Sequence, residues 1–314
     1  MAGRKTGGAR VRARPGARLA AMARSSRAAL EDVGRWLTPK RLRPLLSRAY
    51  YAMLDAGDAI AGRPDPLTPP RSLRRISTDP DNDYRATGRE FVALLTRECG
   101  LRADAAVLDV GCGVGRIAVG LTEYLGAAGR YDGFDIVPAE IEWCRRQITP
   151  RFPQFRFHVA DVRNDAYNPA GATPASQYRF PFPDRSFDIA IVASVFTHLL
   201  TPDLDNYLRE LARVLVPGGR AVASFYLLND TTRGHIAAGR SAFQFTKPIG
   251  DAMVNDADRP SWAVAHDEGR VRATLAANRL EILKWYPGRW ASEGIEVQDL
   301  IIVVKLTTTA ENPD

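Results

Sequence analysis

The chain has 314 residues, 45% of them hydrophobic, and a formal net charge of +7. This length supports one large domain or one domain with additions, and no apolar run approaches the ~20 residues of a membrane-spanning helix. Three cysteines without a CxxC pair argue against a disulfide scaffold and favour a reducing compartment, so we expect a cytoplasmic protein. None of the four histidines lies at metal-ligand spacing from another histidine or a cysteine, so we expect no metal site.

The positive charge is concentrated at the N-terminus. Residues 1–30 contain eight Lys or Arg and no acid, whereas the remainder has 35 basic and 36 acidic residues. We expect a disordered basic tail over residues 1–30, although its Arg-rich composition also resembles a transit peptide. If translation starts at Met22, most of this tail is absent from the protein, and if it starts at Met53, all of it is. Because the remainder is nearly neutral, the charge argues against nucleic acid as a partner of the folded body.

Residues 31–83 are predicted to form a helical extension followed by a proline-rich linker. Apolar residues recur at helical spacing from Glu31 to about Ala61, and residues 63–70 read RPDPLTPP. A basic amphipathic helix can lie on a membrane surface. Packing onto the body of the protein is the more frequent arrangement, and it is our prediction for this helix.

From residue 84 onward, helix-length segments alternate with apolar strands. A helix is predicted over residues 84–98. Strands follow at 106–110, 131–134, 155–159, 188–193 and 220–226. Alternation of this kind is typical of a parallel sheet covered by helices on both faces, so we predict a doubly wound, Rossmann-like α/β fold.

The C-terminal third is less regular. The stretch LVPGGR at 215–220 is predicted to be a turn into the fifth strand, and residues 227–262, with weak periodicity, a lid insertion. A helix over residues 266–278 and two strands, 280–286 and 299–306, are predicted before a frayed C-terminus at 307–314.

The stretch VLDVGCGVGR, residues 107–116, contains three glycines at alternate positions directly after the first strand. Gly111, Gly113 and Gly115 depart from the GxGxxG spacing of dinucleotide sites, no P-loop lysine follows, and Arg116 is the only cation at the turn. Asp135 ends the second strand, where a carboxylate can accept hydrogen bonds from both hydroxyls of a ribose. We therefore expect an adenosine without phosphates, bound outside the carboxyl ends of the strands.

Asp161 and Val162 follow the third strand, where a carboxylate and a backbone N–H could hold an adenine edge. Here the chain resembles class I S-adenosylmethionine-dependent methyltransferases of the small seven-strand type. The stretches VLDVGCGVGR, GFDIVPAEIEWC, FHVADV, FPDRSFDIAIVASVFTHL and LVPGGR carry this resemblance, which extends over residues 84–306. It implies a seven-stranded sheet with an antiparallel last strand and S-adenosylmethionine as the cofactor.

The resemblance also implies which residues hold this cofactor. Asp109 and the three glycines would form its cradle, Asp135 and Ile136 would lie at the ribose, and Asp161 and Val162 at the adenine. The backbone near Ala193 would lie at the methionine arm, which Tyr84 and Gly88 would cover in relatives. The first 80 residues lie outside the resemblance.

Methyl transfer from a sulfonium is an in-line displacement, so a hydroxyl acceptor needs a base and a carboxylate does not. His198 follows the fourth strand and is our first candidate for a base; the alternative is a structural histidine. His266 is the second candidate, and it could instead cap the following helix. Aromatic residues of the lid and final hairpin are expected to line an acceptor pocket. They include Tyr226, His235, Phe243, Phe245, Trp262, Trp285, Tyr286 and Trp290, and we expect some of them to be core residues instead.

The sequence thus predicts an S-adenosylmethionine-dependent methyltransferase that modifies an oxygen of a small molecule. Two alternatives remain open: a nucleic-acid methyltransferase aided by the basic tail, and a non-catalytic nucleoside-binding protein. A nicotinamide dehydrogenase is disfavoured by the glycine spacing. The sequence specifies neither the acceptor nor the oligomeric state.

Overall fold

The structure is a computed structural model that describes residues 43–62, 65–74, 76, 83–293 and 297–307. The chain divides into two compact units, residues 1–63 and 64–314. In the first unit the structure describes one long helix, α2 (Arg43–Ile60). The predicted tail, the start of the helical extension and the predicted C-terminal fraying from residue 308 lie outside the described residues. Among those described, no helix is both long and apolar enough to cross a membrane.

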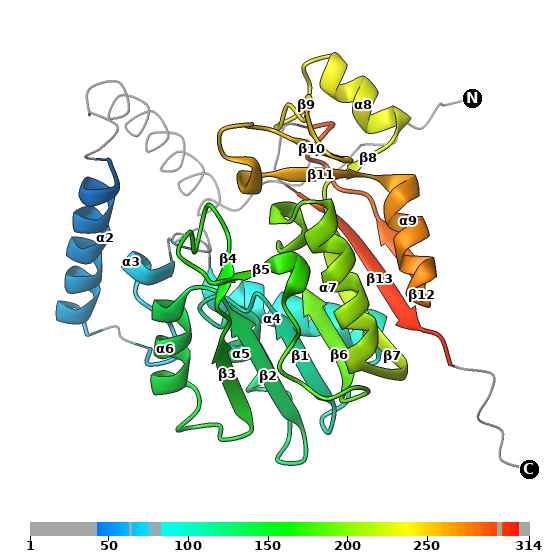
Figure 1. Cartoon of the computed structure of the whole chain (residues 1–314). Coiled ribbons are helices and arrows are strands. Elements are labelled where there is room, and N and C mark those ends of the chain that lie inside the picture. The colour runs from blue at the N-terminus through cyan, green and yellow to red at the C-terminus, as the bar shows by residue number, and fades with distance from the viewer. Residues whose placement is uncertain (1–42, 63–64, 75, 77–82, 294–296, 308–314) are drawn as a thin grey trace, which may run out of the picture. The chain divides into compact units, whose positions relative to one another are not determined.

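The second unit contains a seven-stranded sheet in the order β12-β13-β7-β6-β1-β2-β3 (Figure 1). Its strands are β1 (Ala106–Val110), β2 (Arg130–Asp135), β3 (Phe155–Val159), β6 (Phe187–Val192), β7 (Leu215–Phe225), β12 (Leu280–Tyr286) and β13 (Asp299–Lys305). The last strand, β13, is antiparallel to both its neighbours, while β1, β2, β3, β6 and β7 pair in parallel. The predicted doubly wound sheet with an antiparallel last strand is confirmed.

Both faces of this sheet are buried. Successive side chains of a strand point to opposite faces, and each set belongs to a different hydrophobic cluster. On β1, Val107 belongs to one hydrophobic cluster and Leu108 to the other. Figure 1 shows α7 in front of the sheet and α4 behind it. The helices of the second unit are α3 (Arg71–Arg74), α4 (Tyr84–Leu94), α5 (Arg116–Leu121), α6 (Pro138–Gln147), α7 (Thr201–Val214), α8 (Asp230–Ala237) and α9 (Glu268–Ala277).

Two predicted boundaries differ from the structure. The helix predicted over 84–98 continues beyond α4 as a short π-helix, Leu95–Cys99, that buries Leu95 and Cys99. The predicted turn at 215–220 lies inside β7, where Leu215 pairs with Phe187 and Arg220 with Ile189. Four residues therefore bulge out between the paired positions, and Gly218 takes a positive φ of 79° there.

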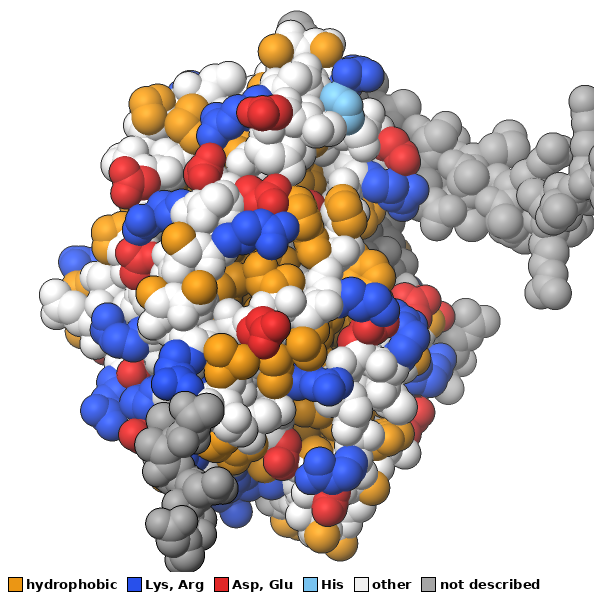
Figure 2. Space-filling view, turned by 90° about the vertical axis from the view of Figure 1, so that its right-hand side faces the viewer, with side chains coloured by type: hydrophobic (Ala, Val, Ile, Leu, Met, Phe, Trp, Pro, Cys, Tyr) orange, Lys and Arg blue, Asp and Glu red, His pale blue; other side chains and the backbone are white. Residues whose placement is uncertain are grey.

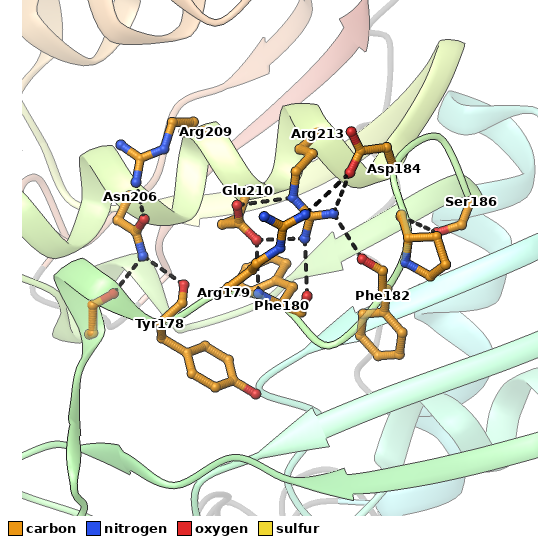
Figure 3. A network of polar contacts seen from close by, with 12 residues as sticks. Tyr178, Arg179, Phe180, Phe182, Asp184, Ser186, Asn206, Arg209, Glu210 and Arg213 are labelled. Atoms are coloured by element: carbon orange, nitrogen blue, oxygen red, sulfur yellow. Dashed lines mark hydrogen bonds and ion pairs between the residues drawn. The ribbon is translucent and has the colours of Figure 1, made fainter.

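The segment between β3 and β6, which we call the insertion (residues 160–186), forms a small parallel pair of strands, β4 (Val162–Arg163) and β5 (Thr173–Pro174). Its second half is attached to α7 (Figure 3). Asn206 donates to the carbonyls of Ala175 and Tyr178, at 2.7 and 2.8 Å. Glu210 accepts from the Phe180 N–H at 2.8 Å. These side chains of α7 fix the path of the insertion beside the sheet.

The lid, residues 227–262, is more ordered than its weak periodicity predicts. It contributes β8 (Leu227–Leu228), β9 (Lys247–Ile249), β10 (Ala252–Val254) and α8, and β11 (Val264–Asp267) completes a four-stranded sheet. The ring centroid of Tyr226 lies 5.0 Å from that of Phe243, 5.2 Å from that of Phe245 and 5.3 Å from that of Trp290. These four aromatic residues are thus among those expected to be core: they do not line the pocket and pack against one another beside this small sheet.

Candidate active site

A cavity of about 310 Å³ lies where the order of the strands reverses beside β1. The turns after β1, β2 and β6 contribute much of its lining. The rest comes from the insertion, the start of α7 and Ser261 of the lid. Of the residues predicted to hold the cofactor, the cavity is lined by Asp109, Gly111, Gly113, Asp135, Ile136, Val162 and Ala193.

Main-chain hydrogen bonds shape the glycine turn, residues 110–115. The N–H groups of Gly111 and Cys112 both donate to the Phe134 carbonyl, at 2.9 and 3.0 Å. The three glycines have φ values of 71°, 52° and 78°. A Cβ on Gly111 would also overlap Cγ2 of Val195, and one on Gly115 would lie 3.0 Å from Cys144 Sγ. A side chain is therefore disfavoured at all three glycines by the backbone conformation, and at Gly111 and Gly115 also by lack of space.

Asp135, at the end of β2, is tied to the glycine turn. Its Oδ2 accepts from the Gly113 N–H at 2.8 Å and its Oδ1 from the Val137 N–H at 2.9 Å. Burial raises the pKa of this carboxyl, and the backbone N–H groups of Val137 and Gly113 oppose that rise. Each carboxylate oxygen has a second lone pair, so Asp135 can accept from a ligand while it keeps both bonds.

Two further charged groups line the cavity. Asp109 is 1% exposed and accepts a hydrogen bond from the Tyr131 hydroxyl at 2.8 Å. Burial raises its pKa to about 7, against the effect of that hydrogen bond. Arg116, at the start of α5, lies over the ring of Phe91, and its buried Nε has no hydrogen-bond partner among the described residues. Burial lowers the pKa of Arg116.

Asp161 does not line the cavity. It is exposed, and its Oδ1 accepts from the Ala172 N–H at 3.1 Å inside the insertion. Val162 does line the cavity, but its N–H donates to the Ala160 carbonyl at 2.9 Å rather than pointing at a ligand. Because the insertion makes its own parallel pair here, the chain turns away from the path that the resemblance implies.

Tyr84 and Gly88 also lie outside the cavity lining and support the glycine turn from behind. The buried Tyr84 hydroxyl donates to the Val114 carbonyl at 2.8 Å. A Cβ on Gly88 would lie 2.6 Å from the Arg116 carbonyl oxygen, and one on Gly120 would lie 2.6 Å from Gly88. The glycine at 88 is thus explained by the close approach of α4 and α5.

His198 and His266 occupy different environments. His198 lines the cavity, and its Nδ1 lies 2.8 Å from the Ser261 carbonyl oxygen. A carbonyl only accepts, so Nδ1 carries the proton, and in the neutral ring Nε2 carries the lone pair. The ring packs edge-to-face on Tyr167, with centroids 5.4 Å apart.

His266 lies outside the cavity lining and is 1% exposed. Its Nε2 lies 3.1 Å from the Leu199 carbonyl oxygen, and burial lowers its pKa to about 4. The N-cap of α9 is Asp267, which accepts from the Arg270 N–H, so His266 does not cap that helix. It joins β11 to the segment that carries His198.

Comparison with known proteins adds to this geometry. Residues 107–219 match a family model described as a methyltransferase domain. The chain carries a methyltransferase domain over these residues. The match begins in β1 and ends in β7, and so contains the glycine turn, Asp135 and His198.

Individual relatives share the domain over part of their length. The chain is 30% identical over 146 residues to the methyltransferase GfsG of Streptomyces halstedii, 46% of each protein. It is 30% identical over 157 residues to the 27-O-demethylrifamycin SV methyltransferase of Amycolatopsis mediterranei (strain S699), 49% of this chain and 52% of the relative. The chain thus spans about half the length of these curated relatives. The solved PH0226 protein from Pyrococcus horikoshii OT3 is 18% identical, with a TM-score of 0.49, over 72% of this chain and 92% of its own.

The cavity of the methyltransferase domain fits S-adenosylmethionine in three respects. The glycine turn lets a ligand approach the backbone, and Asp135 offers two acceptor oxygens for a ribose. The cations in the lining are Arg116 and Arg163, with no lysine, as expected for a nucleoside without phosphates. Of the predicted cofactor residues, Gly115, Asp161, Tyr84 and Gly88 lie outside the cavity lining, and the Val162 N–H already donates to a backbone carbonyl.

Several residues that line the cavity were not predicted from the sequence. They are Asn164, Asp165 and Tyr167 of the insertion, Ser194, Asp203 and Tyr207 near α7, and Ser261. The cluster RNDAYNPAG at 163–171 signalled only a loop. Ser194 has a φ of 58°, uncommon for a residue other than glycine, and its N–H donates to Ser224 Oγ at 2.7 Å. No periodic pattern marks such a position.

Proposed function

We propose that this chain transfers a methyl group from S-adenosylmethionine to an oxygen of a small-molecule acceptor. The proposal depends on one observation above all: the cavity that holds Asp135 beside the glycine turn is also lined by His198, whose Nδ1 is tied to the Ser261 carbonyl. A nucleoside-binding element and a candidate base therefore share one enclosure.

The cofactor supplies an electrophilic methyl group on a sulfonium. In our proposal Asp135 binds the ribose hydroxyls, and the glycine turn lies against the amino-acid arm. Arg116 binds the carboxylate of that arm, which would give its buried guanidinium an anionic partner. Burial raises the pKa of Asp109 to about 7. A cation bound beside Asp109 would favour its ionised form, which would then balance the positive charge.

His198 is proposed as the base. Nε2 would take the proton of an acceptor hydroxyl, and the Nδ1–H bond to Ser261 would hold the ring in the required tautomer and stabilise the imidazolium that forms. The apolar side chains of Leu199 and Leu200, beside His198 in the lining, would help to exclude water.

A small acceptor is supported by the size of the cavity and by the charge pattern of the protein surface. A cavity of about 310 Å³ lies at the lower end of the ~300–1,000 Å³ of ligand sites. Figure 2 shows Lys and Arg interspersed with Asp and Glu on one face, without the single-sign surface that nucleic acid favours. The name of the Amycolatopsis relative, 27-O-demethylrifamycin SV methyltransferase, specifies an oxygen of a small molecule.

The test is transfer from methyl-labelled S-adenosylmethionine to three acceptor pools: small phenols and hydroxy acids, duplex DNA, and RNA. We expect a mass gain of one methyl group on oxygen in the first pool, lost in His198→Ala while S-adenosylhomocysteine binding is kept. Transfer to nucleic acid alone would contradict the proposal, as would equal transfer by wild type and His198→Ala.

A further inference from the structure

The exposed side of α2 is apolar. Side chains are described for residue 46, residue 47 and residues 49–60 of this helix, and none of the exposed ones is charged. The exposed residues are Leu46, Ala49, Tyr50, Ala52, Met53, Ala56, Gly57, Ala59 and Ile60. Asp55 and Asp58 are half-buried instead. A surface helix of a globular protein normally shows the reverse arrangement, with charges outside.

The large apolar side chains form one line along the helix. Leu46, Met53 and Ile60 are 55%, 63% and 89% exposed and follow one another at intervals of seven residues. Seven residues are close to two turns, so these three side chains, which we call the apolar stripe, lie on the same side over about 21 Å. An exposed apolar line of this length is a feature of interaction surfaces.

Charge restricts what could cover the apolar stripe. Residues 1–63 contain 14 Lys or Arg and 4 Asp or Glu, whereas residues 64–314 contain 29 and 32. A second copy of α2 would bring two strongly basic segments together, which repel. Nucleic acid would neutralise the basic charge, but its phosphate backbone offers no apolar surface to cover the apolar stripe. An anionic lipid surface matches both features, because basic side chains bind its headgroups and apolar ones enter the boundary beneath them.

We propose that α2 and the basic segment around it dock on an anionic bilayer surface. The apolar stripe lies at the boundary between headgroups and acyl chains, and the net positive charge of residues 1–63 attracts the anionic headgroups. This places the methyltransferase domain at a membrane surface, and it goes beyond the proposed reaction, on which it does not depend. It is an alternative to the prediction that the helical extension packs onto the body of the protein.

The test is sedimentation of the full chain with vesicles of phosphatidylcholine alone or with 30% phosphatidylglycerol. We expect at least ~10-fold stronger partition onto the anionic vesicles, weakened by 0.5 M salt. Met53→Ser with Ile60→Ser should reduce that partition about 10-fold. The matched control, Leu283→Ser with Leu306→Ser, removes two exposed leucines of the second unit, 46% and 42% exposed, and should leave it unchanged.

Three results would overturn the proposal: equal partition onto both vesicles, partition that both double variants leave unchanged, or no partition at all. A lipid-free dimer that the Met53/Ile60 variant dissociates would assign the apolar stripe to a second copy and overturn it too. Both double variants should keep the wild-type thermal shift with S-adenosylhomocysteine. If that shift is absent from all three proteins, the proposed reaction fails while the vesicle result stands.

Discussion

Two parts of the cavity lining are built in different ways. The first, residues 109–117 and 134–137, is shaped mainly by its backbone: the N–H groups of Gly111 and Cys112 donate to the Phe134 carbonyl, and the Gly113 N–H donates to Asp135 Oδ2. The second comprises the insertion, residues 193–207 and Ser261. Side chains that bind distant carbonyls hold it: His198 to Ser261, His266 to Leu199 and Asn206 to Ala175.

This difference predicts that the second part of the lining tolerates substitutions better than the first. In the first part the backbone itself forms the surface, so an added atom meets backbone or core directly. In the second part each contact depends on one side chain, so it can change without disturbing the sheet. We therefore expect substitutions in the first part to act on folding and cofactor affinity together, and substitutions in the second to act on stability while cofactor affinity is kept.

The largest effect is expected at Gly111. Gly111→Ala places a side chain at a φ of 71° and against Val195 Cγ2, and should lower the free energy of unfolding by about 3 kcal/mol. Val195→Ala should recover part of this loss, since it removes the overlapping methyl group. Denaturant unfolding of the four proteins of this double-mutant cycle measures the coupling, expected to be at least about 1 kcal/mol. Additive losses would show that Val195 is not the obstacle.

Next in size is a pH effect at His266. Its folded pKa of about 4 lies below the 6.5 of an unperturbed histidine, so the unfolded state binds more protons between these two pH values. The stabilisation is complete above pH 6.5 and is lost as the pH falls towards 4. Relative to His266→Gln, wild type should lose about 2–3 kcal/mol between pH 7 and 4.5.

The comparison with His266→Gln is necessary because Asp109 acts in the opposite direction. Its folded pKa of about 7 lies above 3.8, so burying it destabilises the fold progressively as the pH rises through this range. Both proteins contain Asp109, and its effect cancels in the difference. If the free energies of unfolding of the two proteins differ by a constant amount across pH 4.5–7, His266 is not buried in its neutral form.

A smaller effect is expected at Asp135. Asp135→Asn loses the negative charge opposite the ribose hydroxyls, and one amide nitrogen must face a backbone N–H of Gly113 or Val137. We expect S-adenosylhomocysteine affinity to fall ~10–100-fold by calorimetry. The control Asp161→Asn changes a carboxylate outside the cavity and should leave affinity unchanged. Unchanged affinity in Asp135→Asn would contradict the proposed ribose contact, and reduced affinity in Asp161→Asn would show that Asp161 contacts the ligand as the resemblance implies.

The smallest effect tests the second part of the lining. Asn206→Ala leaves the carbonyls of Ala175 and Tyr178 without their donor and should lower stability by about 1–2 kcal/mol. S-adenosylhomocysteine affinity should remain within about twofold of wild type. A loss of affinity as large as that of Asp135→Asn would remove the distinction between the two parts.

What the sequence predicts follows the same division. The strands, the glycine turn and the cavity position of Asp135 could be predicted, because periodicity and positive φ leave direct marks on residue type. The four-stranded lid sheet and the insertion could not, since their order comes from contacts between residues far apart in the chain, such as Asn206 with Ala175. Asp161 was placed at the cavity because it follows the third strand and because the resemblance implies it, whereas in the structure it lies beside the parallel pair of the insertion and outside the cavity lining.

The central claim is that this cavity accepts an unphosphorylated adenosine with an amino-acid arm. Isothermal titration of the full chain with S-adenosylhomocysteine tests it most directly, with NAD titrated in parallel. We predict saturable one-to-one binding of S-adenosylhomocysteine, weakened by Asp135→Asn, and no saturation by NAD. Saturation by NAD together with no heat from S-adenosylhomocysteine would contradict the account.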